Sequence, residues 1–232
     1  MTDWTAISNA ATGGGTLVLA LATFASVRSS NRSARIAEHA LMVGTRPVLV
    51  PSRFEDRSEK IFWADGHFQR LRGGRVSAKI ENDYVYLAMT LRNVGNGIGV
   101  LRGWRLEKYV PGILPAEEVP LEEFRDHSRD MYVPAGDMSF WQAAIRDSNE
   151  DHYEIARVAI EAHEPFIVHV LYTDHEGRQR TVSRFAALPL QGGEWKSDNA
   201  EQHEDGPQWL SSVSRHWFLD NGNGQVSRTP GR

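Results

Sequence analysis

The chain has 232 residues, of which 41% are hydrophobic and 24% are charged, and its formal net charge is −4. This composition allows a hydrophobic core and argues against wholesale disorder, and the negative charge gives no indication of nucleic-acid binding. The chain has no cysteine, which excludes disulfides, thiolate catalysis and cysteine-ligated zinc or iron–sulfur sites.

An uncharged segment near the N-terminus is the first feature of the chain. No charged residue lies between Asp3 and Arg28, and the stretch Thr16–Val27 is strongly apolar. About 20 predominantly apolar residues are enough for a helix to cross the hydrocarbon core of a bilayer. We therefore expect a short flank over 1–6 and a transmembrane helix over 7–27, with the lipid bilayer as a partner.

The composition of this segment leaves alternatives open. Its first half contains polar residues and the run Gly13–Gly15, which also suit a re-entrant or interfacial segment. A cleaved signal peptide fits less well, because no Lys or Arg precedes the apolar run. In a membrane span, Trp4 is expected at the level of the headgroups, where amphipathic aromatic rings are enriched.

Three arginines follow the apolar segment at helical spacing, namely Arg28, Arg32 and Arg35. Because no Lys or Arg precedes the segment, the positive-inside rule predicts that the C-terminal side lies in the cytoplasm. The arginines would flank the membrane and could meet anionic headgroups. The helix is expected to continue as a juxtamembrane stalk over 28–45, since Gly44 is the first helix-ending residue.

Alternating hydrophobic residues predict several short strands after the stalk. The clearest strand is Tyr84–Val94, where aliphatic residues recur with a period of two. The turn Gly95–Gly97 separates it from Ile98–Tyr109, and we expect these two segments to pair as antiparallel neighbours. Further strands are expected at Val48–Val50, Lys60–Ala64, Phe68–Leu71, Val76–Ile80, Met138–Ile145, Phe166–Thr173 and Gln179–Leu188.

Two segments between these strands have other patterns. Residues 111–136 combine prolines with acidic residues and are expected to form a loop. Asn149–Ala162 is expected to form a short helix, with a strand as the alternative because several residues are β-branched. The predicted fold is mainly β: an N-terminal transmembrane helix, then an antiparallel Ig-like β-sandwich over 46–190 with one short helix.

The composition changes again in the C-terminal tail. Residues 191–232 are rich in Gly, Asn, Asp, Glu and Ser, and we expect them to be mostly flexible. Within the tail, a short helix is expected over 207–219, either docked on its own domain or exposed as a partner-binding or membrane-surface helix. The apolar residues that predict it lie near helical spacing: Trp209, Leu210, Val213, Trp217 and Phe218.

No arrangement of residues predicts catalysis, a cofactor or a metal site. The nine histidines include no His-Glu-x-x-His motif. Gly95–Gly99 is expected to be a tight turn rather than a phosphate-binding loop, because a strand and not a helix follows it. Arg70, Arg72 and Arg75, with Phe68 and Trp63 nearby, form a basic and aromatic patch that could bind an anion or lipid headgroups, or be ordinary surface charge.

Four short pieces carry a family resemblance: Arg46-Pro47-Val48-Leu49-Val50, Leu91-Arg92-Asn93-Val94-Gly95-Asn96-Gly97, Val133-Pro134-Ala135-Gly136, and Tyr172-Thr173-Asp174 with Gly177-Arg178. In this order they resemble a loose group of uncharacterised bacterial proteins, many from high-GC lineages. These have one N-terminal membrane anchor and a C-terminal Ig-like β-sandwich domain. The resemblance spans most of residues 16–188. It implies a fold and a topology, and it implies no activity.

Three functions fit the sequence. The first is a non-enzymatic, membrane-tethered interaction or scaffolding module with a protein partner. The second is a domain that senses or processes a small molecule or envelope polymer in a loop-lined pocket around residues 111–136, near His127 or Asp130. The third is an accessory subunit that forms homo-oligomers through its membrane helix, since the small residues Ala10–Gly15 allow close helix packing.

Overall fold

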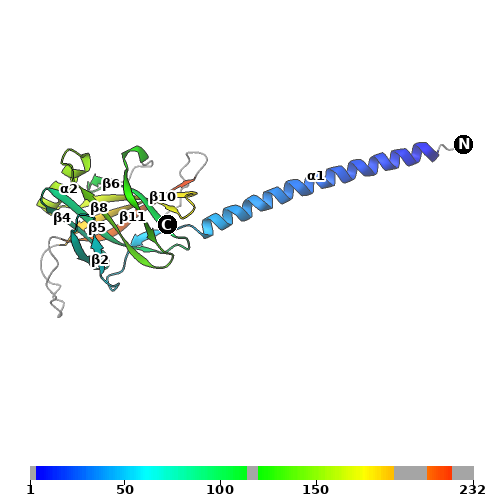
Figure 1. The fold of residues 1–232 in the computed structure, drawn as a ribbon. Coiled ribbons are helices and arrows are strands. Elements are labelled where there is room, and N and C mark those ends of the chain that lie inside the picture. The colour runs from blue at the N-terminus through cyan, green and yellow to red at the C-terminus, as the bar shows by residue number, and fades with distance from the viewer. Residues whose placement is uncertain (1–3, 114–119, 191–207, 221–232) are drawn as a thin grey trace. The chain divides into compact units, whose positions relative to one another are not determined.

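The computed structural model describes residues 4–113, 120–190 and 208–220 and divides into two compact units. The first unit, Met1–Gly44, contains helix α1 (Trp4–Gly44). The second unit, Thr45–Arg232, is a β-rich domain (Figure 1). In the described part of the chain, no helix is both long enough and apolar enough to cross a membrane.

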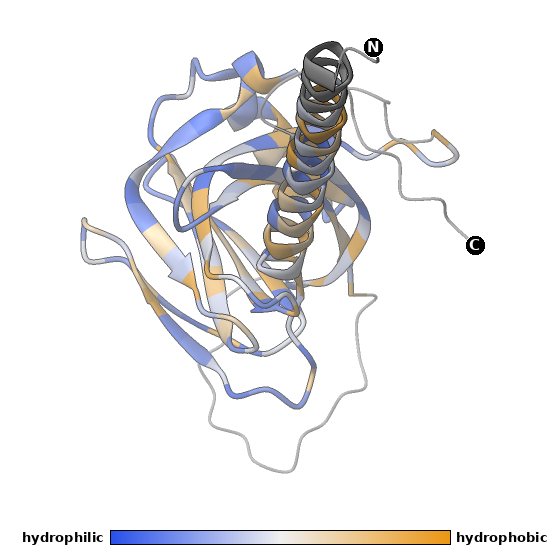
Figure 2. Ribbon diagram, turned by 90° about the vertical axis from the view of Figure 1, so that its right-hand side faces the viewer, coloured by the Kyte–Doolittle hydropathy of each residue, from blue (hydrophilic) through white to orange (hydrophobic). Residues whose placement is uncertain are grey.

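Helix α1 is continuous through the segments expected to form an anchor and a stalk. Taken by itself, the helix exposes every large apolar side chain between Leu17 and Val27, with exposed fractions of 63% at Leu17, 66% at Phe24 and 53% at Val27. In Figure 2, hydrophobic residues colour this helix in bands. At 3.6 residues per turn, the consecutive residues Leu17, Val18 and Leu19 point in three different directions around the helix axis, so the apolar side chains do not form the single stripe that is typical of a helix packed on one core.

The domain contains eleven strands in its described residues, together with helix α2 (Asp151–Ala162) and the short 3-10 helix η1 (Leu121–Glu123). The first five strands are β1 (Leu49–Pro51), β2 (Glu59–Phe62), β3 (Phe68–Leu71), β4 (Arg75–Glu81) and β5 (Tyr84–Asn93). The remaining strands are β6 (Gly99–Lys108), β7 (Arg125–Val133), β8 (Met138–Ile145), β9 (Phe166–Asp174), β10 (Gln179–Pro189) and β11 (Gln208–Asp220).

Nine of the described strands form one antiparallel sheet. Eight of them follow the order β1-β5-β4-β11-β10-β9-β6-β7, and β8 lies off this path and pairs with β5. The sheet curls around the main core, to which β5, β6, β9, β10 and β11 each contribute residues. This confirms a mainly β, antiparallel domain. The pairings do not confirm the Ig-like sandwich, because these strands belong to one continuous sheet rather than to two stacked ones.

Two smaller elements cover the curled sheet. Helix α2 buries Tyr153, Ala156 and Ala159 in the main core, which confirms the expected helix. The hairpin β2–β3 forms a separate two-stranded sheet, and its inner residues pack in a second core with Tyr86 and Ala88 of β5. Strand β5 is therefore buried on both faces, which explains its nearly continuous burial pattern.

Asn93 joins several segments at one end of the domain. Its Oδ1 accepts hydrogen bonds from the N–H groups of Val48 at 3.1 Å and Gly95 at 3.0 Å. Its Nδ2 donates to the carbonyl oxygens of Gly97 at 2.6 Å and Val133 at 3.0 Å. All four hydrogen-bonding positions of the amide are therefore used. The segments 46–50, 91–97 and 133–136 thus meet at one side chain.

The expected pairing of the two long central strands is wrong. β5 pairs with β1, β4 and β8, whereas β6 pairs with β7 and β9. The connection between them packs against the chain that enters the domain: a Cβ on Gly97 would lie 1.8 Å from the carbonyl oxygen of Thr45. The turn therefore crosses between distant parts of the sheet and does not close a hairpin.

The expectation of a loop over 111–136 is also wrong in part, because this range contains η1 and β7. In β7 only Met131 and Val133 are buried, so the strand lacks the aliphatic alternation that would identify it.

The predicted tail helix over 207–219 is wrong as well. These residues form β11, which pairs with β10 along its length and with β4 near its start. Residues 209, 213 and 217 are four apart, and this spacing suits a strand as well as a helix, since four is an even number. The other tail residues, 191–207 and 221–232, lie outside the described residues.

Candidate functional site at the seam between β7 and β8

A cavity of about 190 Å³ lies where the two ends of the curled sheet approach each other. Strands β7 and β8 follow one another in the chain, but their described residues form no ladder with each other. The cavity occupies this seam, beneath the turn of the β2–β3 hairpin. Its walls contain Trp63, Ala64, Trp104, Arg125, Asp126, His127, Ser128, Arg129, Met131, Gln142, Ala143, Ala144 and Arg146.

A large irregularity in β7 forms one wall of this seam pocket. Leu101 of β6 pairs with Met131, and Gly103 pairs with Asp126, so residues 127–130 stand opposite a single β6 residue. Gly103 permits this close approach, because a Cβ there would lie 3.0 Å from the carbonyl oxygen of Arg125. The irregularity removes His127 from the ladder. Bulges commonly re-aim a side chain in this way next to binding sites.

Two polar atoms in the pocket lining are buried without a partner. His127 Nε2 and Gln142 Oε1 have no hydrogen bond within the described residues. Burial lowers the pKa of His127 to about 4, so its imidazole is neutral near pH 7. Nε2 then donates or accepts a hydrogen bond according to the tautomer. Leaving a buried polar group unpaired costs about 1–3 kcal/mol. The pocket therefore favours an occupant that supplies hydrogen bonds at these two atoms.

Ion pairs fix the charged residues at the rim. Arg125 pairs with Glu150, and its guanidinium lies 5.6 Å from the centre of the Trp104 ring. Nη2 of Arg146 lies 2.7 Å from Oδ2 of Asp65. Burial alone would raise the pKa of Asp65, but hydrogen bonds from Arg146 and Tyr86 lower it to about 2. The rim is thus neutralised at two of its arginines, which favours a polar rather than a strongly anionic ligand.

The floor of the pocket is rigid and mostly apolar. Trp63 Nε1 donates to the carbonyl oxygen of Ala143 at 3.1 Å, and Trp104 packs edge-on against Trp141 with ring centres 5.9 Å apart. Trp63 and Trp104 are 6% and 2% exposed, so both rings are held by packing. The pocket therefore places several polar groups around a packed aromatic floor, and fixed polar groups of this kind orient a bound ligand.

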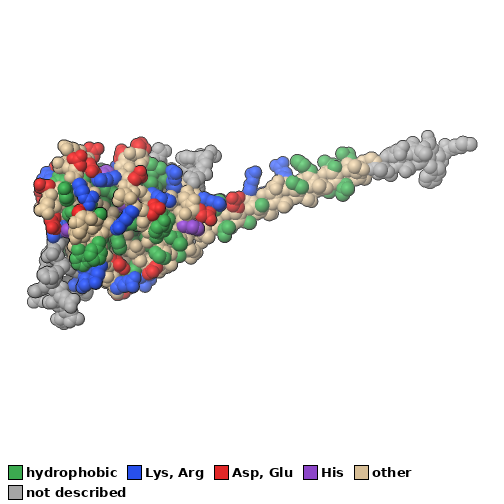
Figure 3. All heavy atoms as spheres, in the orientation of Figure 1, with side chains coloured by type: hydrophobic (Ala, Val, Ile, Leu, Met, Phe, Trp, Pro, Cys, Tyr) green, Lys and Arg blue, Asp and Glu red, His purple; other side chains and the backbone are tan. Residues whose placement is uncertain are grey.

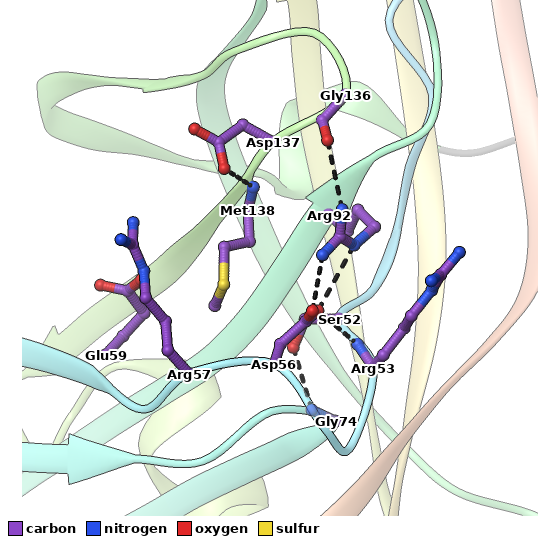
Figure 4. Close-up of polar contacts among 10 residues, drawn as sticks. All are labelled: Ser52, Arg53, Asp56, Arg57, Glu59, Gly74, Arg92, Gly136, Asp137 and Met138. Carbon is purple, nitrogen blue, oxygen red and sulfur yellow. Dashed lines mark hydrogen bonds and ion pairs between the residues drawn. The ribbon is translucent and has the colours of Figure 1, made fainter.

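A second polar cluster, shown in Figure 4, has a structural role. Arg92 donates to Asp56 through Nη2 at 2.6 Å and Nε at 3.3 Å, and through Nη1 to the carbonyl oxygen of Gly136 at 3.2 Å. Asp56 also accepts the N–H of Arg53 at 2.8 Å. These hydrogen bonds join the β1–β2 loop, β5 and the β7–β8 turn. The partners satisfy each other, so the cluster braces the fold.

A serine and a histidine also meet inside the domain. Ser183 Oγ lies 2.6 Å from His216 Nδ1 and 3.0 Å from the hydroxyl of Tyr172. This resembles a nucleophile beside its base. Ser183 is completely buried, however, and the Tyr172 hydroxyl also accepts the N–H of Leu49 at 3.2 Å. The network therefore joins β1 to β9, β10 and β11, and a substrate has no access to it.

The residues expected to bind a partner are mostly part of the core. Trp209 and Trp217 are 0% and 1% exposed, and Val213 packs against the main core. Leu210 and Phe218 are half-buried in the same strand. These five residues form part of the sheet in β11, so they do not form an exposed binding helix.

The other expected site residues lie on two different elements. Arg28, Arg32 and Arg35 lie on α1, as does Trp4, whose side chain lies outside the described residues. Arg70 stands on the exposed face of β3 and Arg72 follows that strand. Arg75 begins β4 and lies 5.7 Å from the centre of the Phe54 ring. No group of three His, Asp or Glu side chains in the described ranges could hold a metal ion.

The sequence predicted the β7 wall of the seam pocket but not the β8 wall. Residues near His127 were expected to line a pocket, whereas Asp130 instead pairs with Arg102 at 2.7 Å. Gln142 and Arg146 were not anticipated, because only the curl of the sheet brings β8 beside β7. Comparisons with protein-family models, with characterised proteins and with solved structures find no match to this chain.

Proposed function

We propose that this chain is a membrane-tethered binding domain whose seam pocket holds a small polar ligand. One observation carries the proposal: His127 Nε2 and Gln142 Oε1 are buried at the same cavity without partners in the described residues. The pocket favours the second function expected from the sequence over a scaffold that lacks a concave site. Its volume of about 190 Å³ is below the roughly 300–1,000 Å³ of sites for drug-sized molecules, so the ligand is small.

The chemistry of the lining defines the ligand class. Gln142 Oε1 only accepts hydrogen bonds, so the ligand presents an O–H or N–H donor to it. The neutral imidazole of His127 can complement either a donor or an acceptor. A small molecule with neighbouring hydroxyl, amide or amine groups meets both requirements, and Arg129 at the rim can receive one negative charge.

Tethering is proposed from α1. Leu17, Val18 and Leu19 point in different directions around the helix and are each more than 60% exposed, which favours an apolar environment around this stretch. Arg28, Arg32 and Arg35 follow, and the proposed orientation places the domain in the cytoplasm. Carbonate extraction of membranes tests the anchor, and a topology reporter after Arg232 tests the orientation. Release of the full-length chain into the aqueous fraction would refute tethering.

Thermal unfolding of the full chain in mild detergent tests the pocket. A library of small polar metabolites at millimolar concentration is expected to contain ligands that raise Tm, because a ligand that binds only the folded state stabilises it. The double variant His127→Leu/Gln142→Leu removes both unpaired atoms and is expected to lose the shift. His175→Leu, at a side chain that is 63% exposed, is a control for the loss of a histidine away from the pocket. Ligands that stabilise the wild type and the pocket variant equally would contradict the assignment.

A further inference from the structure

The outer face of the β2–β3 hairpin carries an unusual set of side chains. In the hairpin register, Phe62 lies opposite Phe68, and Lys60 lies opposite Arg70. Phe62 is 58% exposed and Phe68 is 45% exposed, and their ring centres lie 4.8 Å apart. Because alternate residues of a strand share a face, all four side chains project from the same side of the hairpin.

The packing that holds the hairpin on the domain comes from its other face. The hairpin is held by its inner face, where Ile61 and Leu71 are completely buried and pack in the second core. On the outer face, the register places the basic residues Lys60 and Arg70 directly opposite each other. The exposed phenylalanine pair next to them gains little from its partial burial. In Figure 3, hydrophobic side chains gather in the region of β2, with Lys and Arg side chains beside them.

We propose that this hairpin face docks on an anionic lipid surface. Lys and Arg beside exposed aromatic rings match the two layers of such a surface, since the cations meet lipid phosphates and the rings enter the region below them. Two rings and two cations are too few for a stable protein interface, which buries about 800 Å² on each partner. A fluid bilayer requires no such area and no fixed complementary shape.

The proposal adds a second membrane contact to the tether, and it rests on the tether only for the proximity of the bilayer. A weak surface contact is effective when a linked anchor keeps it near its target, because the effective concentration is then high. The hairpin would thereby orient the domain at the membrane. Vesicle flotation of the full chain reports the anchor, so a failure of the tether and a failure of hairpin docking are separate results.

Site-specific fluorescence on the full chain tests the docking. The chain has no cysteine, so Ser58→Cys, at an exposed residue just before β2, gives a single labelling site, and Ser148→Cys before α2 gives a control site. Each labelled chain is reconstituted into phosphatidylcholine vesicles with or without anionic phosphatidylglycerol, and nitroxide lipids serve as quenchers. Quenching is expected at position 58 in the anionic vesicles only, and not at position 148.

Two variants identify the residues responsible. Each basic residue near an anionic surface contributes a change of about fivefold, so Lys60→Glu/Arg70→Glu is expected to lower the ratio of docked to undocked protein at least 25-fold. Phe62→Ser/Phe68→Ser is expected to abolish quenching without changing the net charge. Lys108→Glu/Arg180→Glu makes the same charge change elsewhere on the domain and is expected to leave quenching intact. Equal quenching in both vesicle types, no quenching in either, or wild-type quenching in both hairpin variants would overturn the proposal.

Discussion

Gln142 connects the seam pocket to the strand that carries Phe62. Its Nε2 donates to the carbonyl oxygen of Phe62 at 3.4 Å, and its Oε1 is buried at the pocket without a partner among the described residues. One amide therefore lies between the proposed ligand and the proposed membrane contact. A ligand that orders Gln142 would also order β2, so occupancy of the pocket is expected to increase docking of the hairpin.

Replacement of His127 should change the response of the fold to acid. Burial holds the pKa of His127 at about 4, below the ordinary value of 6.5, so the unfolded chain binds a proton more readily than the folded one. The associated stability is complete above about pH 6.5 and is lost as the pH falls toward 4. His127→Leu is expected to remove up to about 3 kcal/mol of this loss, measured by urea unfolding at pH 7.5 and pH 4.5.

The control for this prediction is His175→Leu, because the side chain of His175 is 63% exposed. The control should leave the difference in unfolding free energy between the two pH values unchanged. A His127 variant with the full wild-type acid response would show that His127 is not buried as a neutral imidazole.

Asp65 should stabilise the domain in a lower pH range. Its folded pKa is about 2 against an ordinary value of 3.8, so its contribution is present above about pH 4 and is lost as the pH falls toward 2. Asp65→Asn is expected to lower the free energy of unfolding at pH 6 and to flatten its dependence between pH 4 and pH 2. Asp83→Asn, at an exposed carboxylate in the turn between β4 and β5, provides the comparison in the same titration.

Gly97 should not tolerate a side chain. A Cβ at this position would lie 1.8 Å from the carbonyl oxygen of Thr45, a backbone atom that cannot move aside as a side chain can. Gly97→Ala is expected to destabilise the domain by about 3 kcal/mol or more, as measured by chemical denaturation. At Gly99 the nearest atom would be 3.4 Å away, so Gly99→Ala should cost under about 1 kcal/mol. Similar costs at the two glycines would contradict the observed crossing.

The last strand should be essential for the core. Trp217 is 1% exposed, and its ring packs 5.8 Å from His169. Trp217→Ala is expected to cost about 3–5 kcal/mol in the free energy of unfolding, whereas Phe54→Ala, at a residue 67% exposed, should cost much less. An undiminished stability in the Trp217 variant would restore the interpretation of this segment as an accessory tail.

Local patterns predicted the strands more successfully than the way they pair. The alternation in β5 correctly predicted a strand, because an alternating pattern depends only on neighbouring residues. The pairing of β11 between β10 and β4 joins segments far apart in the chain, and nothing in the tail indicates these partners. The same reason explains why only half of the seam pocket was predicted. His127 lies in the segment 111–136 that was expected to line a pocket, whereas Gln142 reaches the pocket only through the curl of the sheet.

Ligand binding in the seam pocket can be followed directly by NMR. The side-chain nitrogen signals of His127 and Gln142 are recorded while metabolites that raise Tm are added to the full chain. Both signals are expected to shift together and to saturate with a Kd below about 1 mM. The double variant His127→Leu/Gln142→Leu is expected to abolish binding. Binding that leaves both signals unmoved, or that persists in the double variant, would contradict the proposed ligand site.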